Sequence, residues 1–277
     1  MIFIHSVWES LCKNLDELGL HSVTAEAVLK GEKGEKYFVL KHDVETDVSK
    51  ALKMAQIEAS FGHRGSYYVQ AYLLNDEKNV SLLKEIKELG HEISYHYDVM
   101  DFTKGDLEAA ITEFEKNKKL FEGNGFTLST LCQHGNPVVE RIGYTSNRDF
   151  FRSERVQSLY GKLCDIMVDF KQKANTEYIY FSDAGRRFNL IFDPINNDII
   201  KSDDKNIPID IMHTLVEYIG KGNCIVSVHP HRWEKTAFVY CLKRATFKAV
   251  KAAARFFMQI PVAKKIMSKY YYLAKKI

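Results

Sequence analysis

The chain has 277 residues, of which 45% are hydrophobic and 27% are charged, a composition typical of a soluble globular protein with one large core. Its five cysteines are widely spaced and form no CxxC pair, which argues against a disulfide-rich secreted scaffold and favours a reducing compartment. The N-terminus lacks the basic and apolar features of a secretion signal, and no uncharged apolar run approaches the ~18 residues of a spanning helix. We therefore expect a cytoplasmic protein.

The net charge of +3 hides two regions of opposite sign. Residues 235–277 contain eleven Lys or Arg and no Asp or Glu, so the 28 basic and 36 acidic side chains of residues 1–234 give that part a net charge of −8. Such segregation says more about a partner than the total charge does. We expect three segments: a helical one over residues 1–35, a β/α domain over 36–234 and a basic helical tail over 235–277.

From residue 37 onwards, short β-branched and aromatic runs alternate with amphipathic stretches that end at glycine. Such a series predicts parallel strands joined by right-handed crossovers. We expect a (β/α) barrel, irregular or incomplete, with a doubly wound sheet as the alternative. The expected strands cover residues 37–42, 66–70, 92–96 and 128–132, and the expected helices cover residues 47–61, 77–89 and 105–122.

The second half of the domain is less regular. Residues 138–177 are rich in Arg, Tyr and Ser, and we interpret them as an insertion over the site. A run at 178–181 and a final run at 224–228 have strand composition, and a helix over 208–220 precedes the last of them.

Ionisable residues follow the strand-like runs repeatedly, at the end where sites are built in α/β proteins. A histidine after one strand is usually a solvated loop residue, but a series of five indicates a shared pocket. Alternatively, Asp43 is a helix N-cap and Glu45 a first-turn acid beside the helix dipole. The strand-end residues are Asp43 and Glu45, then His96, His134, Asp183 and His229.

The order of these motifs resembles the polysaccharide deacetylase (NodB-homology) family of carbohydrate esterases, and most closely its divergent branch in surface-polysaccharide biosynthesis. The resemblance covers about residues 36–233 and implies a distorted (β/α) barrel with a divalent metal, zinc above all, at its mouth. The most specific motif is Gly90-His91-Glu92-Ile93-Ser94-Tyr95-His96; the others are His42-Asp43-Val44-Glu45, His134-Gly135-Asn136-Pro137, Tyr180-Phe181-Ser182-Asp183 and Ser227-Val228-His229-Pro230.

The resemblance implies a role for each matching residue. Asp43 matches the base, Glu45 and His96 match metal ligands, His229 matches the acid that protonates the departing amine, and Asp183 matches its partner. Residues i and i+2 on a strand share a face, so one carboxylate holds the cation while its neighbour takes a proton from water. A histidine has the pKa that an acid near neutral pH requires.

Two departures from the family pattern stand out. Met100 occupies the place of the second metal histidine, and Asp98, Asp101, His134 or an extra water would complete the coordination sphere. The family's Arg-Pro-Pro-Tyr-Gly motif is absent, and Arg186 or Arg187 would supply the missing positive charge. Aromatic rings at a barrel mouth suit stacking on a sugar. Expected substrate contacts are Tyr68, His134, Asn136, Arg187 and Trp233.

The basic tail has apolar residues every three or four positions from Phe238 to Ile260, with Lys and Arg on another face. Pro261 ends this helix, and a second stripe covers residues 262–277. The apolar stripe packs on the barrel or another subunit, or it docks on an anionic membrane surface at the inner face of the cell membrane. Nucleic acid is not an expected partner, because no recognition motif is present and the body is acidic.

Together these features predict a metal-dependent deacetylase, a hydrolase of an N-acetylated or O-acetylated sugar in capsule, O-antigen or lipid-linked glycan biosynthesis. The alternative is a catalytically silent barrel that binds glycan or a biosynthetic partner at the membrane surface. Met100 and the missing arginine motif favour that alternative.

Overall fold

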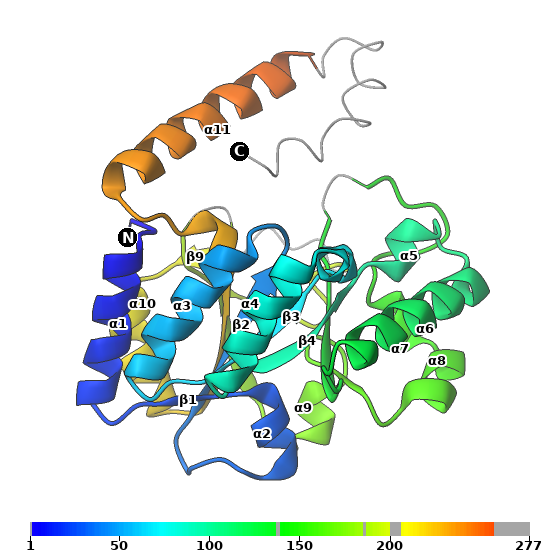
Figure 1. Ribbon diagram of the computed structural model, residues 1–277, viewed down its shortest axis with the longest axis horizontal. Coiled ribbons are helices and arrows are strands. Elements are labelled where there is room, and N and C mark those ends of the chain that lie inside the picture. Colours follow the sequence, from blue (N-terminus) through cyan, green and yellow to red (C-terminus); the bar gives the residue numbers. More distant parts are fainter. Residues whose placement is uncertain (1, 137–138, 185–186, 200–205, 258–277) are drawn as a thin grey trace.

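The protein is described by a computed structural model that covers residues 2–136, 139–184, 187–199 and 206–257 (Figure 1). It has a mixed α/β fold in which helices surround a central sheet. The apolar runs of the sequence form its strands, as β-branched and aromatic side chains favour. The strands are β1 (Ser22–Val23), β2 (Phe38–Val44), β3 (Gly65–Val69), β4 (Glu92–Tyr97), β5 (Thr130–Gln133), β6 (Cys164–Asp165), β7 (Tyr178–Ser182), β8 (Asn189–Ile191), β9 (Asn206–Pro208) and β10 (Asn223–Val228).

The helices alternate with these strands, and several begin at an aspartate whose side chain accepts a backbone N–H. They are α1 (His5–Glu17), α2 (Ala25–Lys30), α3 (Val48–Ser60), α4 (Glu77–Glu88), α5 (Val99–Phe102), α6 (Leu107–Gly123), α7 (Asp149–Arg152), α8 (Glu154–Tyr160), α9 (Phe170–Lys173), α10 (Ile211–Ile219) and α11 (Ala237–Phe257), with 3₁₀ turns η1 (Ala71–Asn75) and η2 (Pro230–Arg232).

The sheet has the strand order β6-β5-β4-β3-β2-β10-β7-β8-β9, with β1 paired to β2. Every pairing is parallel except β7 with β8 and β8 with β9. The expected barrel is therefore only partly realised: among the described residues, β6 and β9 end the sheet and do not pair with each other. The sheet curls instead: Phe170, in helix α9 after β6, stacks on Tyr178 of β7 with 5.1 Å between ring centroids.

The curl gives the sheet an inner and an outer face, and β2 shows how the sequence divides between them. Val39 joins the inner cluster of buried residues, whereas Phe38 and Leu40 pack with the helices outside. Because side chains alternate along a strand, Lys41 and Asp43 also point inward. All of β2 is buried, so the inward polar residues lie in the interior of the molecule, where they need partners.

A buried carboxylate fastens the outer helices to β2. Glu58 of α3 accepts hydrogen bonds from Trp8 Nε1 at 3.0 Å and from the Tyr67 hydroxyl at 2.7 Å. His42 Nε2 of β2 lies 3.0 Å from the same carboxylate. Burial alone would raise the pKa of Glu58, but His42 and the hydrogen bonds hold it below its ordinary value. The strand that carries Asp43 is thereby fixed from behind.

Residues 138–177 differ from the expected insertion. Their described part contains α7, α8, β6 and α9, and β6 extends the parallel sheet beside β5. Phe150 and Phe151 of α7 are fully buried in the outer core. The segment is thus an integral part of the fold. Its strand β6 is too short to be recognised in a sequence that is rich in polar residues.

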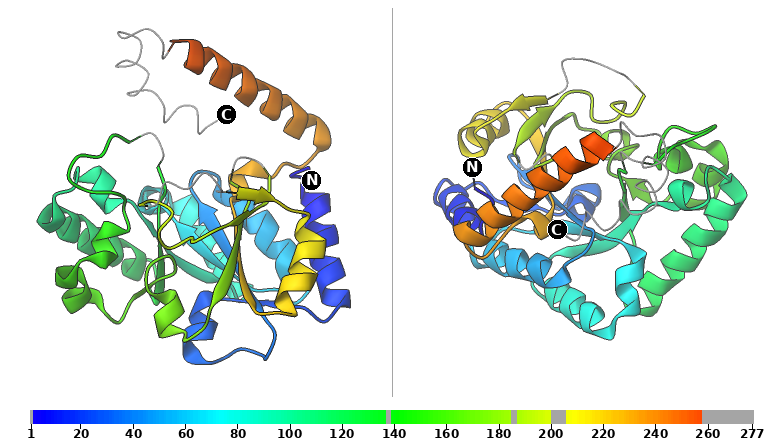
Figure 2. Two further views of the ribbon diagram at one scale, coloured as in Figure 1. Left: turned by 180° about the vertical axis from the view of Figure 1, so that it is seen from behind. Right: turned by 90° about the horizontal axis from the view of Figure 1, so that it is seen from above.

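Helix α11 begins shortly after β10 and lies over the carboxyl ends of the strands (Figures 1 and 2). Tyr240 is buried against Phe3, with 6.2 Å between ring centroids. No helix within the described residues has both the length and the apolar character that crossing a bilayer requires. The expected second stripe, at residues 262–277, and the helix end at Pro261 lie outside the described residues.

Candidate active site

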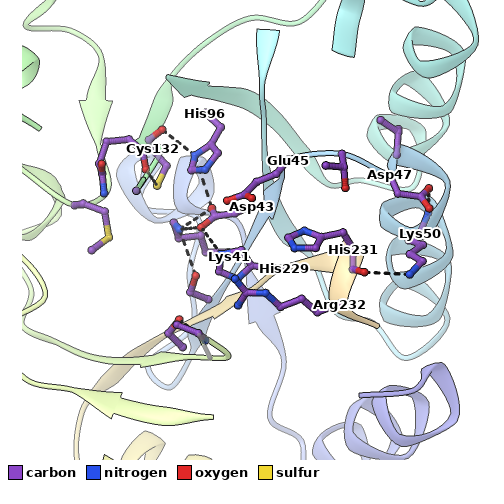
Figure 3. Close-up of a pocket in the computed structure, with 18 of the residues that line it drawn as sticks. Lys41, Asp43, Glu45, Asp47, Lys50, His96, Cys132, His229, His231 and Arg232 are labelled. Carbon is purple, nitrogen blue, oxygen red and sulfur yellow. Dashed lines mark hydrogen bonds and ion pairs between the residues drawn. The ribbon is translucent and has the colours of Figure 1, made fainter. Parts of the chain in front are cut away.

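A cavity of about 950 Å³ opens at the carboxyl ends of the strands (Figure 3). Five strands contribute to it because parallel strands present these ends at one edge of the sheet. Asp43 comes from β2 and Glu45 from directly after it, His96 from β4, Cys132 from β5, Ser182 from the end of β7 and His229 from just beyond β10. The residues that the sequence places far apart therefore meet around one space.

Asp43 lies at the centre of this group and has a cationic partner that the sequence motifs did not indicate. Lys41 Nζ donates to both carboxylate oxygens of Asp43 at 2.6 Å and to Ser227 Oγ at 3.3 Å. Burial opposes the charge of Asp43, but Lys41, His96 and His229 outweigh it and hold the pKa of Asp43 far below its ordinary value. Asp43 is therefore an ionised carboxylate with a fixed orientation.

The pairing of Lys41 with Asp43 could have been predicted from the sequence. Lys41 stands two residues before Asp43 on a strand that alternates faces, so both side chains had to point the same way. A lysine inside a fully buried strand requires a counter-charge. The family pattern instead directed the expectation of a positive charge to Arg186 and Arg187, far along the chain.

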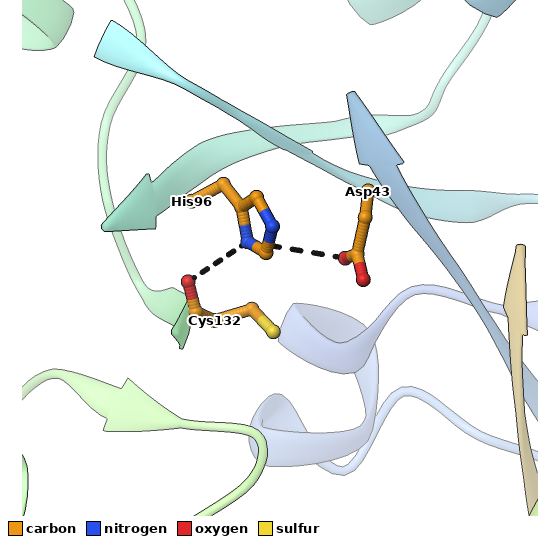
Figure 4. A group of neighbouring side chains, drawn as sticks. All are labelled: Asp43, His96 and Cys132. Atoms are coloured by element: carbon orange, nitrogen blue, oxygen red, sulfur yellow. Dashed lines mark hydrogen bonds and ion pairs between the residues drawn. The ribbon is translucent and has the colours of Figure 1, made fainter. Parts of the chain in front are cut away.

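The imidazole ring of His96, on β4, points towards the carboxylate of Asp43 (Figure 4). Its Nδ1 lies 3.1 Å from the carbonyl oxygen of Cys132 and 3.9 Å from Asp43 Oδ1. A carbonyl only accepts, so the geometry assigns the proton to Nδ1 and leaves Nε2 as the basic nitrogen. Burial is the main cause that lowers the pKa of His96 to about 3. The ring is therefore neutral near pH 7, in the form that ligates metals.

Glu45 and His134 meet on the other side of His96. His134 Nε2 lies 3.4 Å from Glu45 Oε1, and the rings of His96 and His134 are 5.2 Å apart. Donor atoms of Glu45, His96 and His134 all lie within 4.8 Å of one another, as do those of Asp43, His96 and Cys132. Two imidazoles and a carboxylate, all buried, fit zinc or a similar divalent ion.

His229 completes the cavity opposite His96. Its Nδ1 lies 2.6 Å from Asp183 Oδ1, and its backbone N–H donates to Asp183 Oδ2 at 3.0 Å. Arg232 also donates to Asp183, at 3.0 Å. Although burial opposes ionisation, His229 and Arg232 lower the pKa of Asp183. The carboxylate thus binds the Nδ1–H and turns Nε2 of His229 towards Asp43, 3.7 Å away.

The candidates for completing the metal sphere separate clearly. Asp101 does not join the site, because Arg141 holds both of its oxygens at 2.8 Å and Asn147 donates to it at 2.9 Å. Met100 packs in the outer core and is 4% exposed. His134 instead reaches the carboxylate of Glu45 from the end of β5, a juxtaposition that sequence spacing alone did not specify.

Four of the expected substrate contacts do not line the cavity. Tyr68 is fully buried beneath Lys41, with its hydroxyl bonded to Thr130 Oγ1 at 2.8 Å. Trp233 is fully buried and stacks on Phe3, so neither ring can meet a sugar. Arg187 is exposed and Asn136 is partly buried, and neither lines the cavity. Arg186 lies outside the described residues.

The helix-capping alternative for Asp43 and Glu45 does not hold. Helix α3 begins after Asp47, whose side chain accepts the backbone N–H of Lys50 at 3.2 Å. Asp43 lies within β2 and Glu45 directly after it, and both carboxylates line the cavity.

Comparison with known proteins places few constraints on this chain. No family model matches the sequence, and a search of curated proteins finds no relative. Among solved structures, the chain is similar to the peptidoglycan deacetylase PdaC from Bacillus subtilis, with a TM-score of 0.35 and 11% sequence identity over 69% of this chain and 87% of that one. Because both values are this low, the chemistry of this chain has to follow from its own side chains.

Proposed function

We propose that the protein is a metal-dependent deacetylase that hydrolyses an acetyl group from an amino sugar, as the N-acetyl amide or an O-acetyl ester. The observation that carries the proposal is the meeting of three groups at one cavity: the donor set Glu45, His96 and His134, the Lys41–Asp43 pair, and the His229–Asp183 pair. Five of these residues line the cavity, and the buried His134 and Asp183 contact two of them, Glu45 and His229. Amide hydrolysis requires an activated water and a proton for the leaving amine, and these three groups correspond to those requirements.

Glu45, His96 and His134 would hold the cation, with zinc the best match to the donor types. A divalent ion in such a site polarises a carbonyl and lowers the pKa of a water molecule towards ~7. Asp43 accepts a proton from water, since it is ionised and Lys41 keeps its oxygens in place. Nε2 of His229 donates a proton to the leaving nitrogen, and Asp183 holds the ring for that transfer and stabilises its positive charge.

The cavity suits a sugar in both size and polarity. About 950 Å³ holds more than one pyranose ring, and the lining includes Lys50, Asp76, Asn79, Arg148 and Asn197 beside the central groups. Such side chains hydrogen-bond hydroxyl groups. We propose a surface polysaccharide or lipid-linked glycan precursor as the substrate class.

The alternative, a silent barrel that only binds glycan, was favoured by Met100 and by the absence of the arginine motif. His134 brings an imidazole to the donor set, and Lys41 brings a cation to Asp43. These contacts support the enzyme over the binding protein, because a site used only for glycan recognition does not require a buried lysine–aspartate pair beside two imidazoles.

The test is acetate release from N-acetylglucosamine oligosaccharides and from O-acetylated glycans by the zinc-loaded protein and by Asp43→Asn. The wild type is expected to release acetate, and Asp43→Asn to retain zinc and release none. His229→Asn serves as a second variant in case Asp43→Asn folds poorly. Turnover by Asp43→Asn equal to that of the wild type would refute the role of Asp43. The silent barrel would be favoured if the zinc-free wild type binds glycan and the wild type hydrolyses none with any metal added.

A further inference from the structure

Helix α11 presents two opposite faces, and among the described residues one of them is buried against the body while the other is exposed. Tyr240, Lys243 and Phe247 recur every three or four residues and therefore lie on one side of the helix. Tyr240 is buried, whereas Lys243 and Phe247 line the cavity of the candidate site. Lys243 also pairs with Glu234 at 3.1 Å. This inner face anchors α11 beside the mouth of the cavity.

The outer face is apolar and exposed. Phe238 is 77% exposed and Leu242 is 58% exposed, and the exposed Ala245 and Ala249 follow at the same spacing. At 100° per residue, these four side chains lie about half a turn away from Tyr240 and Phe247. Two large apolar side chains aligned on one exposed helix face mark a binding surface more specifically than scattered ones do.

The charges around this face identify the partner. Arg244 and Lys248 are exposed between the two faces, and residues 235–277 contain eleven Lys or Arg without one Asp or Glu. An apolar stripe whose charged neighbours on α11 are all cations is complementary to a surface that is apolar inside and anionic at its boundary. A protein partner would need an apolar groove with an acidic rim, and pairing of α11 with α11 of a second copy would bring like charges together.

We propose that α11 is an interfacial helix that docks the protein on an anionic membrane surface through Phe238 and Leu242. The inner face of the same helix borders the cavity, so docking holds the cavity mouth next to the membrane. A substrate carried on a lipid is then presented in the plane where the cavity lies. The docking itself does not depend on the catalytic activity proposed above.

The experiment is flotation of the full chain with vesicles of phosphatidylcholine alone and of an equal mixture of phosphatidylcholine and phosphatidylglycerol. The wild type is expected to float with the anionic vesicles, to float far less with the neutral ones, and to be released by high salt, which screens the attraction. The double variant Phe238→Asp with Leu242→Asp is expected to lose most of the floated fraction.

The matched control is Phe102→Asp with Ile142→Asp, which replaces side chains that are 67% and 83% exposed elsewhere on the body and changes the charge equally. It is expected to float like the wild type. Failure of the wild type to float with anionic vesicles would overturn the proposal. Equal loss of flotation in both double variants would also overturn it. So would a wild type that is a dimer without lipid and does not float, if Phe238→Asp with Leu242→Asp makes it a monomer, because the apolar face would then bind a second copy.

Discussion

Lys41 and Asp43 form a buried ion pair within a single strand, with Nζ 2.6 Å from both carboxylate oxygens. Their side chains are 2% and 9% exposed, so neither charge is well solvated. The pair explains how β2 carries two ionised groups into the interior. It also fixes the Asp43 carboxylate towards the cavity, beside His96 and His229.

Removal of Lys41 should therefore be costly. Lys41→Met leaves Asp43 as a buried carboxylate without its main counter-charge, and breaking such a pair from one side costs about 3–5 kcal/mol. Urea unfolding measures the loss, with Lys36→Met, an exposed lysine just before the strand, as the control. Adding Asp43→Asn to Lys41→Met should cost less than the two single changes together, since no charge is then left unpaired. A loss in Lys41→Met below about 1 kcal/mol would mean that the other groups around Asp43 suffice.

Asp183 should act on the reaction through His229 alone. In Asp183→Asn an amide faces Nδ1 of His229 and cannot stabilise a charged ring, so kcat is expected to fall by about 10²- to 10⁴-fold. Zinc content should be unchanged, because Asp183 is absent from both donor sets. The matched control is Asp210→Asn. Asp210 is the N-cap of helix α10, and asparagine caps a helix about as well as aspartate does. Unchanged kcat in Asp183→Asn would contradict the role of Asp183 in holding His229 for proton transfer.

Asp198 links the loop that contains Asn197, a residue of the cavity lining, to helix α7. Arg152 Nη1 and Nη2 lie 2.8 and 2.9 Å from its oxygens, and Arg148 Nη1 lies 3.1 Å away. Burial opposes ionisation, but hydrogen bonds from Arg152 and Ser146 and the charge of Arg148 lower the pKa of Asp198 from 3.8 to about 2.

This depressed pKa predicts a pH-dependent contribution to stability. Since the folded-state pKa lies below the unfolded one, the contribution, about 1–2 kcal/mol, is fully present above about pH 5 and is lost as pH falls towards ~2. The difference in unfolding free energy between the wild type and Asp198→Asn should therefore narrow between about pH 5 and pH 3. Asp193→Asn, at an exposed position of the same loop, should show no such narrowing. A difference that stays constant over this range would contradict the assignment.

Much of the fold could be predicted because the sequence pattern is regular where the structure is regular. Strands β2, β3 and β4 and helices α3, α4 and α6 begin and end within two residues of their expected bounds. Strand β6 has only two residues, Cys164 and Asp165, too few for any alternation to be visible. Closure of the sheet also could not be decided, since it depends on pairing between strands far apart in the chain.

The candidate site could also be predicted only in part. Asp43, Glu45, His96 and His229 could be placed because each follows or ends a strand, and parallel strands bring such residues together. His134 could be nominated but not chosen over Asp101, since the difference is that Arg141 neutralises Asp101. Trp233 resembled a sugar-stacking ring in sequence, but its contacts with Phe3 and Trp8 put it in the core.

The proposed metal site is tested most sharply by the zinc content of the purified chain, measured by elemental analysis after reconstitution and removal of free metal. The site of Glu45, His96 and His134 predicts one zinc ion per chain for the wild type and a large loss of bound zinc in His96→Ala and His134→Ala. Met100→Leu, a volume-conserving change in the core, should keep its zinc. A wild type that binds no metal, or a His134→Ala variant that binds as much as the wild type, would contradict the proposed site.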